Sequence, residues 1–138
     1  MDNCIFCKII DGVIPSSTVY EDGDFKAIMD IAPATRGHII ILPKKHCENL
    51  FELEEELASK ALVVAKKIAQ AMKEELGFEG MNLLQNNGKV AGQTVFHFHI
   101  HLIPRNAGDQ VKMTWSTGSY GEGEAAQLAK AIADRINN

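Results

Sequence analysis

Three histidines alternate with apolar residues in the short segment His97-Phe98-His99-Ile100-His101. Successive side chains of a β-strand point to opposite faces, so the three imidazoles would share one face and the apolar residues would enter a core. Imidazole changes its charge near neutral pH and serves as a nucleophile, an acid–base group or a metal ligand. The pattern therefore predicts a strand face that does chemistry, in preference to a solvated face.

A three-histidine zinc site is one alternative for this segment. Residues two apart in a strand are separated by about 7 Å, so His97 and His101 would lie about 13–14 Å apart. Bonds between zinc and nitrogen are about 2 Å long, which prevents all three rings from reaching one ion. At most one or two of these histidines would bind a metal.

The pair Cys4-x-x-Cys7 is a second candidate for metal chemistry. Two thiolates at this spacing supply half of a tetrahedral zinc site, and a reduced thiol pair without metal is the alternative. Three cysteines in 138 residues suit a reducing compartment better than a disulfide framework. We interpret Cys47 as a bystander.

Composition excludes several classes of function. The net charge is −4, from 14 basic and 18 acidic residues, which argues against bulk binding to nucleic acid but not against a small nucleotide. No segment approaches the roughly 20 apolar residues of a membrane helix. The first ten residues lack the positive region of a signal peptide. We therefore expect a cytoplasmic protein with neither a nucleic-acid nor a membrane partner.

Hydrophobic periodicity predicts the elements that position these groups. Apolar residues recur every three or four positions over 52–76, which predicts a long helix ending at Gly77. Strands are expected over 18–21, 25–30, 38–42, 81–85 and 96–103, with short helices in the first 12 residues and over 123–136. Local strand connections around one long helix predict one α+β domain over 1–138 with a largely antiparallel five-stranded sheet. Its core would span about 4–105 and its tail about 106–138.

Together these motifs resemble the histidine-triad (HIT) family. Besides the histidine segment, the resemblance rests on Asp30-Ile31-Ala32-Pro33, on Gly-His-Ile-Ile-Ile-Leu-Pro-Lys-Lys-His at 37–46, and on Gly-Gln-Thr-Val-Phe at 92–96, all in the family's order. It covers about residues 4–105 and is strongest to the small nucleotide-binding branch and its bacterial relatives. It implies a HIT-like homodimer with a purine nucleotide substrate. The implied reaction cleaves nucleoside phosphoramidates or acyl-nucleotide adducts through a nucleotidyl-histidine intermediate.

The resemblance also implies a role for each catalytic residue. His99 would be the nucleophile, with its other ring N–H held by the backbone carbonyl of His97. His101 would face the phosphate and the leaving group, and His38 would orient His101 from behind. Thr94 would bond the leaving atom, at a position where relatives often have serine.

The implied nucleotide contacts fall into three groups. Gly92 and Gln93 would bring backbone N–H groups and an amide to the α-phosphate. Asn86 would contact the phosphate or ribose, and Asp30 would accept hydrogen bonds from the ribose hydroxyls. An apolar slot for the base, equally readable as core, would be formed by Ile5, Phe6, Ile9, Ile28 and Ile31.

Bacterial relatives imply that His46 and His97 complete the zinc site begun by Cys4 and Cys7. Two thiolates and two imidazoles would make a closed structural site, and the chemical step itself would need no cofactor.

Two other functions stay open at this point. One is hydrolysis of dinucleoside polyphosphates, and the other is nucleotide binding without turnover, which the intact His99 disfavours. Beyond residue 106 the resemblance is loose, and there Met113, Trp115 and Tyr120 would pack on the active site of a partner copy.

Overall fold

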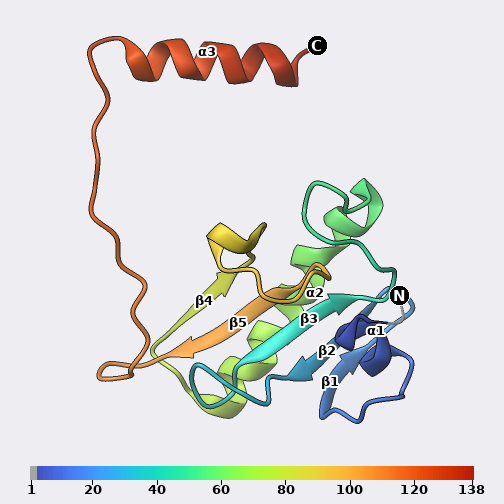
Figure 1. Cartoon of the computed structure of the whole chain (residues 1–138). Helices are drawn as coiled ribbons and strands as arrows, with labels where there is room; N and C mark the ends of the chain where they lie inside the picture. The colour runs from blue at the N-terminus through green and yellow to red at the C-terminus, as the bar shows by residue number, and fades with distance from the viewer. Residues whose placement is uncertain (1–2) are drawn as a thin grey trace.

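The computed structural model describes residues 3–138. Its elements follow the predicted order, with bounds close to those predicted except at the starts of the long helix and of the last strand. Positions 1 and 2 of the expected first helix lie outside the described residues. Figure 1 shows them in chain order: α1 (Ile5–Ile10), β1 (Thr18–Glu21), β2 (Phe25–Met29), β3 (Ile39–Pro43), α2 (Glu55–Leu76), β4 (Gly80–Leu84), the 3₁₀ turn η1 (Lys89–Ala91), β5 (Ile100–Arg105) and α3 (Glu124–Ile136).

The five strands form one sheet in the order β1-β2-β3-β5-β4, and every neighbouring pair is antiparallel. This confirms the predicted α+β class and sheet. The register places His101 of β5 opposite Ile40 of β3 on one side and opposite Leu84 of β4 on the other. His101 thus lies in an interior strand of the sheet, whereas β4 is an edge strand.

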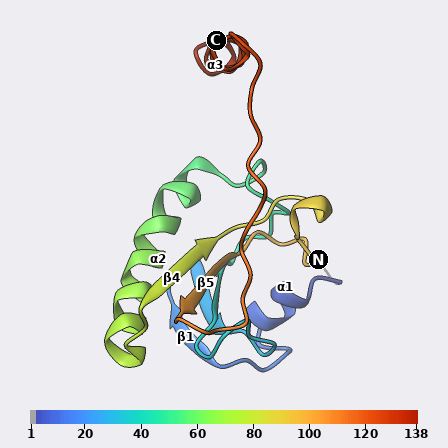
Figure 2. The ribbon, with the colours of Figure 1, turned by 90° about the vertical axis from the view of Figure 1, so that its left-hand side faces the viewer.

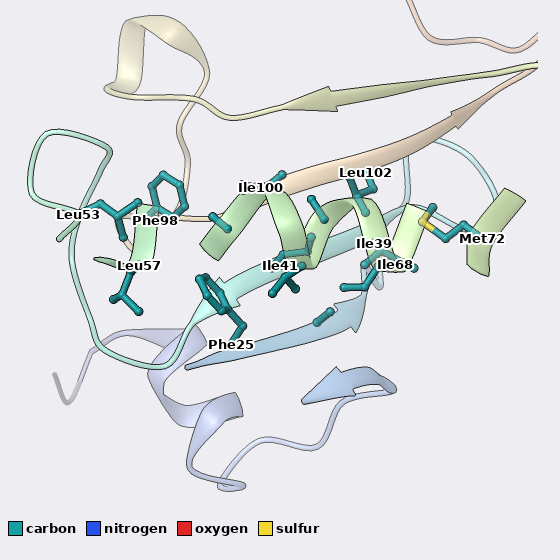
Figure 3. Packing of buried hydrophobic residues seen from close by; sticks show 14 residues of the cluster. Phe25, Ile39, Ile41, Leu53, Leu57, Ile68, Met72, Phe98, Ile100 and Leu102 are labelled. Carbon is teal, nitrogen blue, oxygen red and sulfur yellow. The ribbon is translucent and has the colours of Figure 1, made fainter. Parts of the chain in front are cut away.

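Helices cover both faces of the sheet, α2 on one and α1 on the other (Figure 2). Alternation along β3 divides the core: Ile39 and Ile41 face α2, whereas Ile40 and Leu42 join Phe6 of α1 in a smaller cluster. Figure 3 shows the larger cluster, in which residues of β2, β3 and β5 pack against α2. The sheet is therefore fixed from both sides.

The helix α2 buries one stripe against the sheet, consisting of Leu57, Ala61, Val64, Ala65, Ile68 and Met72. Burying each large side chain of this kind contributes about 1.5–3 kcal/mol. The helix ends at Gly77, whose φ of 62° is the left-handed conformation that glycine adopts without strain. It begins three residues later than predicted, because Glu54 is extended (φ −62°, ψ 142°) and serves as the N-cap.

The strand predicted at 96–103 is shifted in the structure. β5 begins at Ile100, so His97 and His99 precede it, and it continues through Pro104, which was expected to end it. The start differs because the N–H of Phe98 donates to the carbonyl of Cys47 (2.7 Å), which lies in a loop. The predicted division of faces is still observed, since Phe98, Ile100 and Leu102 all enter the α2 core.

Beyond β5 the chain extends away from the sheet and the two helices packed on it. An extended segment leads to α3, which stands apart from the sheet in both views (Figures 1 and 2). Every residue over 114–138 is exposed. Within residues 3–138, none of the helices has the length and apolar character needed to cross a membrane.

Candidate active site

Four histidines gather on the α1 side of the sheet. His38 leads into β3, His101 lies in β5, and His97 and His99 lead into β5. The ring of Phe6 from α1 packs edge-on against His97 and His99, with centroid distances of 5.9 and 5.0 Å. The rings of His99 and His101 are 4.8 Å apart. One short helix and two strands thus build a single imidazole cluster.

The tautomer of His99 is set by its neighbour. Its Nδ1 lies 2.7 Å from the backbone carbonyl oxygen of His97, which can only accept, so Nδ1 carries the proton. Burial lowers the pKa of His99, against the opposing effects of the His97 carbonyl and of Asp30. The ring is therefore neutral at pH 7, with its free lone pair on Nε2. This is the form of imidazole that can attack phosphorus without first losing a proton.

His38 and His101 form a directed hydrogen-bond chain. The N–H of Ala34 donates to Nδ1 of His38 (3.0 Å), so the proton of neutral His38 is on Nε2. That Nε2–H donates to Nδ1 of His101 (2.8 Å), which leaves the proton of His101 on its own Nε2. Burial first, then the neighbouring rings of His99 and His38, lower the pKa of His101 to about 4. His101 is thus a neutral ring with a donor N–H.

Asp30, His38 and His101 bring three possible ligand atoms within 4.8 Å of one another. Oδ2 of Asp30 lies 3.6 Å from Nε2 of His38, and Oδ1 accepts from the N–H of Ala32 (2.8 Å). Because Nε2 of His38 carries a proton in the chain above, it has no lone pair to offer an ion. This group is therefore a proton-ordered chain next to a carboxylate and lacks the donor set of a metal centre.

Cys4, Cys7, His46 and His97 form a second group whose ligand atoms also lie within 4.8 Å. Nε2 of His97 donates to the carbonyl of Pro43 (2.8 Å), so its Nδ1 lone pair faces the thiols at 3.4 and 3.6 Å. Nδ1 of His46 is 3.4 Å from Sγ of Cys7 and 3.1 Å from Nδ1 of His97. Bonds of about 2.3 Å to sulfur and 2.0–2.1 Å to nitrogen give a tetrahedron with edges of about 3.3–3.8 Å. These side chains fit a tetrahedral zinc ion.

Their surroundings hold the cysteines of this group in the thiol form. Burial and the adjacent Cys4 thiol raise the pKa of Cys7 to about 11. A coordinated divalent cation reverses this effect, because a thiol bound to such an ion is deprotonated. Cys47, interpreted as a bystander, packs against the α2 core and is not one of the four.

Gln93 differs from its predicted role. The side chain is only 2% exposed, and its amide N–H₂ donates to the carbonyls of Glu48 (2.6 Å) and Val95 (3.1 Å). Its Oε1 accepts from the N–H of Gly88 (2.8 Å), and its own N–H donates to the Gly88 carbonyl (3.1 Å). The donors expected to reach the α-phosphate are therefore engaged within the protein. Gln93 braces the loop that carries Gly92 and Thr94.

Gly92 and Thr94, which flank Gln93 in this loop, leave the space beside them open. Gly92 has a φ of 98°, and a Cβ added there would lie 3.5 Å from the side-chain nitrogen of Asn86. The absence of a side chain at Gly92 thus leaves the Asn86 amide accessible beside the loop. Thr94 is exposed and lines an open cavity of about 730 Å³ with Asn3, Cys4, Ile5, His46, Val95 and Phe96.

The five residues predicted to form a slot for the base separate into two sets. Phe6, Ile9 and Ile28 are buried in the smaller core cluster, on the α1 side of the sheet, so they contribute to the core. Ile5 and Ile31 are 45% and 96% exposed. Apolar character alone did not distinguish these two environments.

Two functional groups escaped the sequence analysis, the N–H of Ala34 and the carbonyl of Pro43. Each fixes the tautomer of a histidine, His38 in one case and His97 in the other. Both are backbone atoms, so no side-chain type could have marked them.

Comparison with known protein families decides the classification. The HIT domain matches residues 11–108. The chain belongs to the HIT family. Among HIT relatives, "Protein hit" of Bacillus subtilis is 44% identical over 98% of this chain and 95% of its own length. Adenosine 5'-monophosphoramidase hnt1 of Schizosaccharomyces pombe is 36% identical over 97% of this chain and 98% of its own length.

Solved HIT structures share the fold. A HIT family protein from Bacillus anthracis is 47% identical and matches with a TM-score of 0.93, covering 97% of both chains. A Zn-bound histidine triad family protein from Mycobacterium smegmatis is 36% identical with a TM-score of 0.76, covering 99% of this chain and 96% of its own. The family and its monophosphoramidase members support a nucleotide hydrolase of HIT type.

Proposed function

We propose that this chain hydrolyses purine nucleoside phosphoramidates or acyl-nucleotide adducts and that His99 carries the nucleotidyl group between the two steps. The observation that carries the proposal is the Nδ1–H of His99 held by the His97 carbonyl at 2.7 Å, which leaves Nε2 free to attack. The similarity to an adenosine 5'-monophosphoramidase supports the choice of substrate.

In the first step Nε2 of His99 attacks the α-phosphorus and the P–N bond of the phosphoramidate breaks. The bonding pair leaves with the nitrogen, which takes up a solvent proton and departs as an amine. The Nε2–H of His101 donates to a phosphate oxygen or to the leaving atom, where charge develops. The hydrogen bond from His38 keeps the proton of His101 on its Nε2.

In the second step water attacks the phosphorus of nucleotidyl-His99. The P–N bond to the ring breaks, its electron pair returns to Nε2, and a nucleoside monophosphate and a proton are released. Splitting one difficult displacement into two easier ones is the usual advantage of covalent catalysis. Thr94 and Asn86 remain assigned to the leaving atom and to the phosphate or ribose, and Asp30 to the ribose hydroxyls.

We further assign a structural zinc ion to Cys4, Cys7, His46 and His97, which supplies no chemistry to the reaction. The four donors fit a tetrahedron, and a related structure is described as Zn-bound. The working unit is a homodimer, in which Met113, Trp115 and Tyr120 lie near the active site of the partner copy.

The test is a steady-state assay of adenosine 5′-phosphoramidate beside diadenosine polyphosphate, with His99→Ala as the control. Preferential cleavage of the phosphoramidate that is lost in the variant supports the proposal. Turnover of the polyphosphate alone would replace the proposed substrate class, and binding without turnover of either would reduce the protein to a nucleotide-binding module.

A further inference from the structure

The open cavity beside Thr94 is separate from the groups assigned to the nucleotide. Its volume of about 730 Å³ is far larger than the roughly 30 Å³ that a water molecule occupies in the liquid. Asn86 and Asp30, assigned to the phosphate and the ribose, do not line it. The lining consists of Asn3, Cys4, Ile5, His46, Thr94, Val95 and Phe96. The cavity therefore has room for a part of the substrate other than the nucleotide.

One residue joins this cavity to the proposed reaction. Of the groups that the proposed reaction assigns to the phosphate, the ribose or the leaving atom, Thr94 alone lines the cavity. The attacking and leaving atoms are roughly in line at phosphorus, so the leaving atom lies on the side of phosphorus away from His99. Because Thr94 is the residue assigned to that atom, the group that the leaving atom carries would continue from Thr94 into the cavity.

Hydrogen bonds hold the walls of the cavity in place. The amide of Gln93 donates to the carbonyls of Val95 (3.1 Å) and Glu48 (2.6 Å). These bonds join the wall that precedes β5 to the segment that carries His46. Nδ1 of His46 in turn lies 3.4 Å from Sγ of Cys7 in α1, and the start of that helix forms the third wall. The walls are thus positioned before a ligand arrives, as is usual for small-molecule sites.

The lining of the cavity favours apolar groups. Ile5, predicted to form part of the base slot, lines this cavity together with Phe96, and each is 45% exposed. Val95 adds an apolar side chain that packs against the smaller core cluster. None of the lining residues is an aspartate, a glutamate, a lysine or an arginine, so a charged ligand group would find no ion-pair partner there. The ring of Phe96 suits a second aromatic ring.

We propose that this cavity is the leaving-group subsite and that it takes an uncharged aromatic or alkyl group. That group is carried on the amine of a phosphoramidate or on the acyl part of an acyl-nucleotide adduct, so the inference rests on the proposed function and narrows its substrate class. Leaving groups with an ammonium group at the far end are disfavoured, since no carboxylate lines the cavity. The product released beside the nucleoside monophosphate is then an arylalkyl or alkyl amine, or the corresponding acid.

Adenosine 5′-phosphoramidates that carry a phenethyl or an aminopentyl group on nitrogen test the subsite by turnover. We expect kcat/KM for the phenethyl compound to exceed that for the aminopentyl compound by about 10-fold, as a well-placed apolar group does. Phe96→Ala should lower this ratio several-fold, and Phe96→Glu should reverse it, because a carboxylate then meets the ammonium group. The ratio compares two substrates on one protein, so a partial loss of folded enzyme cancels.

Phe51→Ala is the matched control for these variants. It removes a phenylalanine that is 85% exposed and lies outside the cavity, and it should keep the wild-type ratio. A wild-type ratio near one that Phe96→Glu leaves unchanged would overturn the proposal.

Binding to His99→Ala separates the subsite from the reaction. This variant lacks the proposed nucleophile, so calorimetry measures the Kd of each intact compound without turnover. The phenethyl compound should bind about 10-fold more tightly than the aminopentyl compound. Its phenyl protons should show nuclear Overhauser effects to the methyl groups of Ile5 and Val95.

The outcomes of this measurement distinguish the two proposals. Equal Kd values, or no contacts between the phenyl group and these methyl groups, would overturn the subsite even if the wild-type enzyme hydrolyses both compounds. Tighter binding of the phenethyl compound with those contacts, but no turnover by the wild type, would support the subsite and overturn the proposed reaction.

Discussion

The backbone carbonyl of His97 holds Nδ1 of His99 at 2.7 Å, while the ring of the same His97 points its Nδ1 at Cys4 and Cys7. One residue thus fixes the tautomer of His99, the proposed nucleophile, with its backbone and joins the cysteine group with its side chain. The proposed metal ligands and the proposed catalytic histidines are thus linked through a single residue, His97. Substitution of Cys4 or Cys7 should therefore affect catalysis by moving His99, and it should leave the identity of the reacting atoms unchanged.

Folding should become less favourable as the pH falls below about 6.5, partly through His101. Its pKa is lowered to about 4 in the folded state, so between pH 6.5 and 4 the unfolded chain binds more protons than the folded chain. The free energy of unfolding then decreases with falling pH, by less than the limit of about 1.4 kcal/mol per pH unit for one group.

Urea denaturation at pH 7.5, 6.0 and 5.0 measures this effect against His101→Asn, which has no titrating ring. The difference in unfolding free energy between wild type and variant should shift against the wild type on acidification. A difference that does not change with pH would show that His101 keeps its ordinary pKa.

The donor from His38 should matter for catalysis more than for binding. His38→Ala removes the hydrogen bond that holds the tautomer of His101, and we expect kcat to fall about 10- to 100-fold with little change in the Kd for AMP. His38→Gln supplies a side-chain N–H in place of the ring N–H and should recover part of the rate. Equal losses in both variants, together with weakened AMP binding, would assign His38 a purely structural role.

The cysteine group should bind one zinc ion per chain, measured by elemental analysis after purification without added metal. Cys7→Ser removes one thiolate from a four-coordinate site and should lose the ion and lower the Tm by at least about 5 °C. Cys47→Ser is the matched control, since Cys47 lies outside the ligand group, and it should keep the zinc. A metal-free wild-type protein with an unchanged Tm in chelator would favour a plain thiol pair.

A substitution of Gln93 distinguishes a role in supporting the loop from a role in binding phosphate. Gln93→Ala leaves two carbonyls and one N–H without their buried partner, and we expect a loss of about 1–3 kcal/mol in the free energy of unfolding. The KM should change little at temperatures where the variant stays folded. A large rise in KM at unchanged stability would restore Gln93 as a direct phosphate ligand.

Periodicity and alternation predicted the sheet, the long helix and the division of His99 and Ile100 between two faces, because these depend on side chains and local spacing. The start of β5 was predicted wrongly. The hydrogen bond from the Phe98 N–H to the Cys47 carbonyl joins residues 51 apart in sequence, and no local sequence pattern indicates such a contact. Tertiary hydrogen bonds decided that boundary.

The candidate site shows the same limit at finer scale. The residue types of the histidine cluster and of the cysteine group could be read directly from the motifs. The orientation of the Gln93 amide could not, because a buried amide and a phosphate-binding amide have the same sequence signature. The backbone groups of Ala34 and Pro43 left no signature of any kind.

The most direct test of the central proposal is to look for the nucleotidyl group on His99. The enzyme is mixed with adenosine 5′-phosphoramidate, quenched within milliseconds under conditions that preserve phosphorus–nitrogen bonds, digested and analysed by mass spectrometry. We predict an adenylyl adduct on the peptide containing residues 97–101, localised to His99 and absent from His99→Ala. Turnover at the wild-type rate with no adduct at any quench time, or with an adduct on another residue, would contradict His99 as the nucleophile.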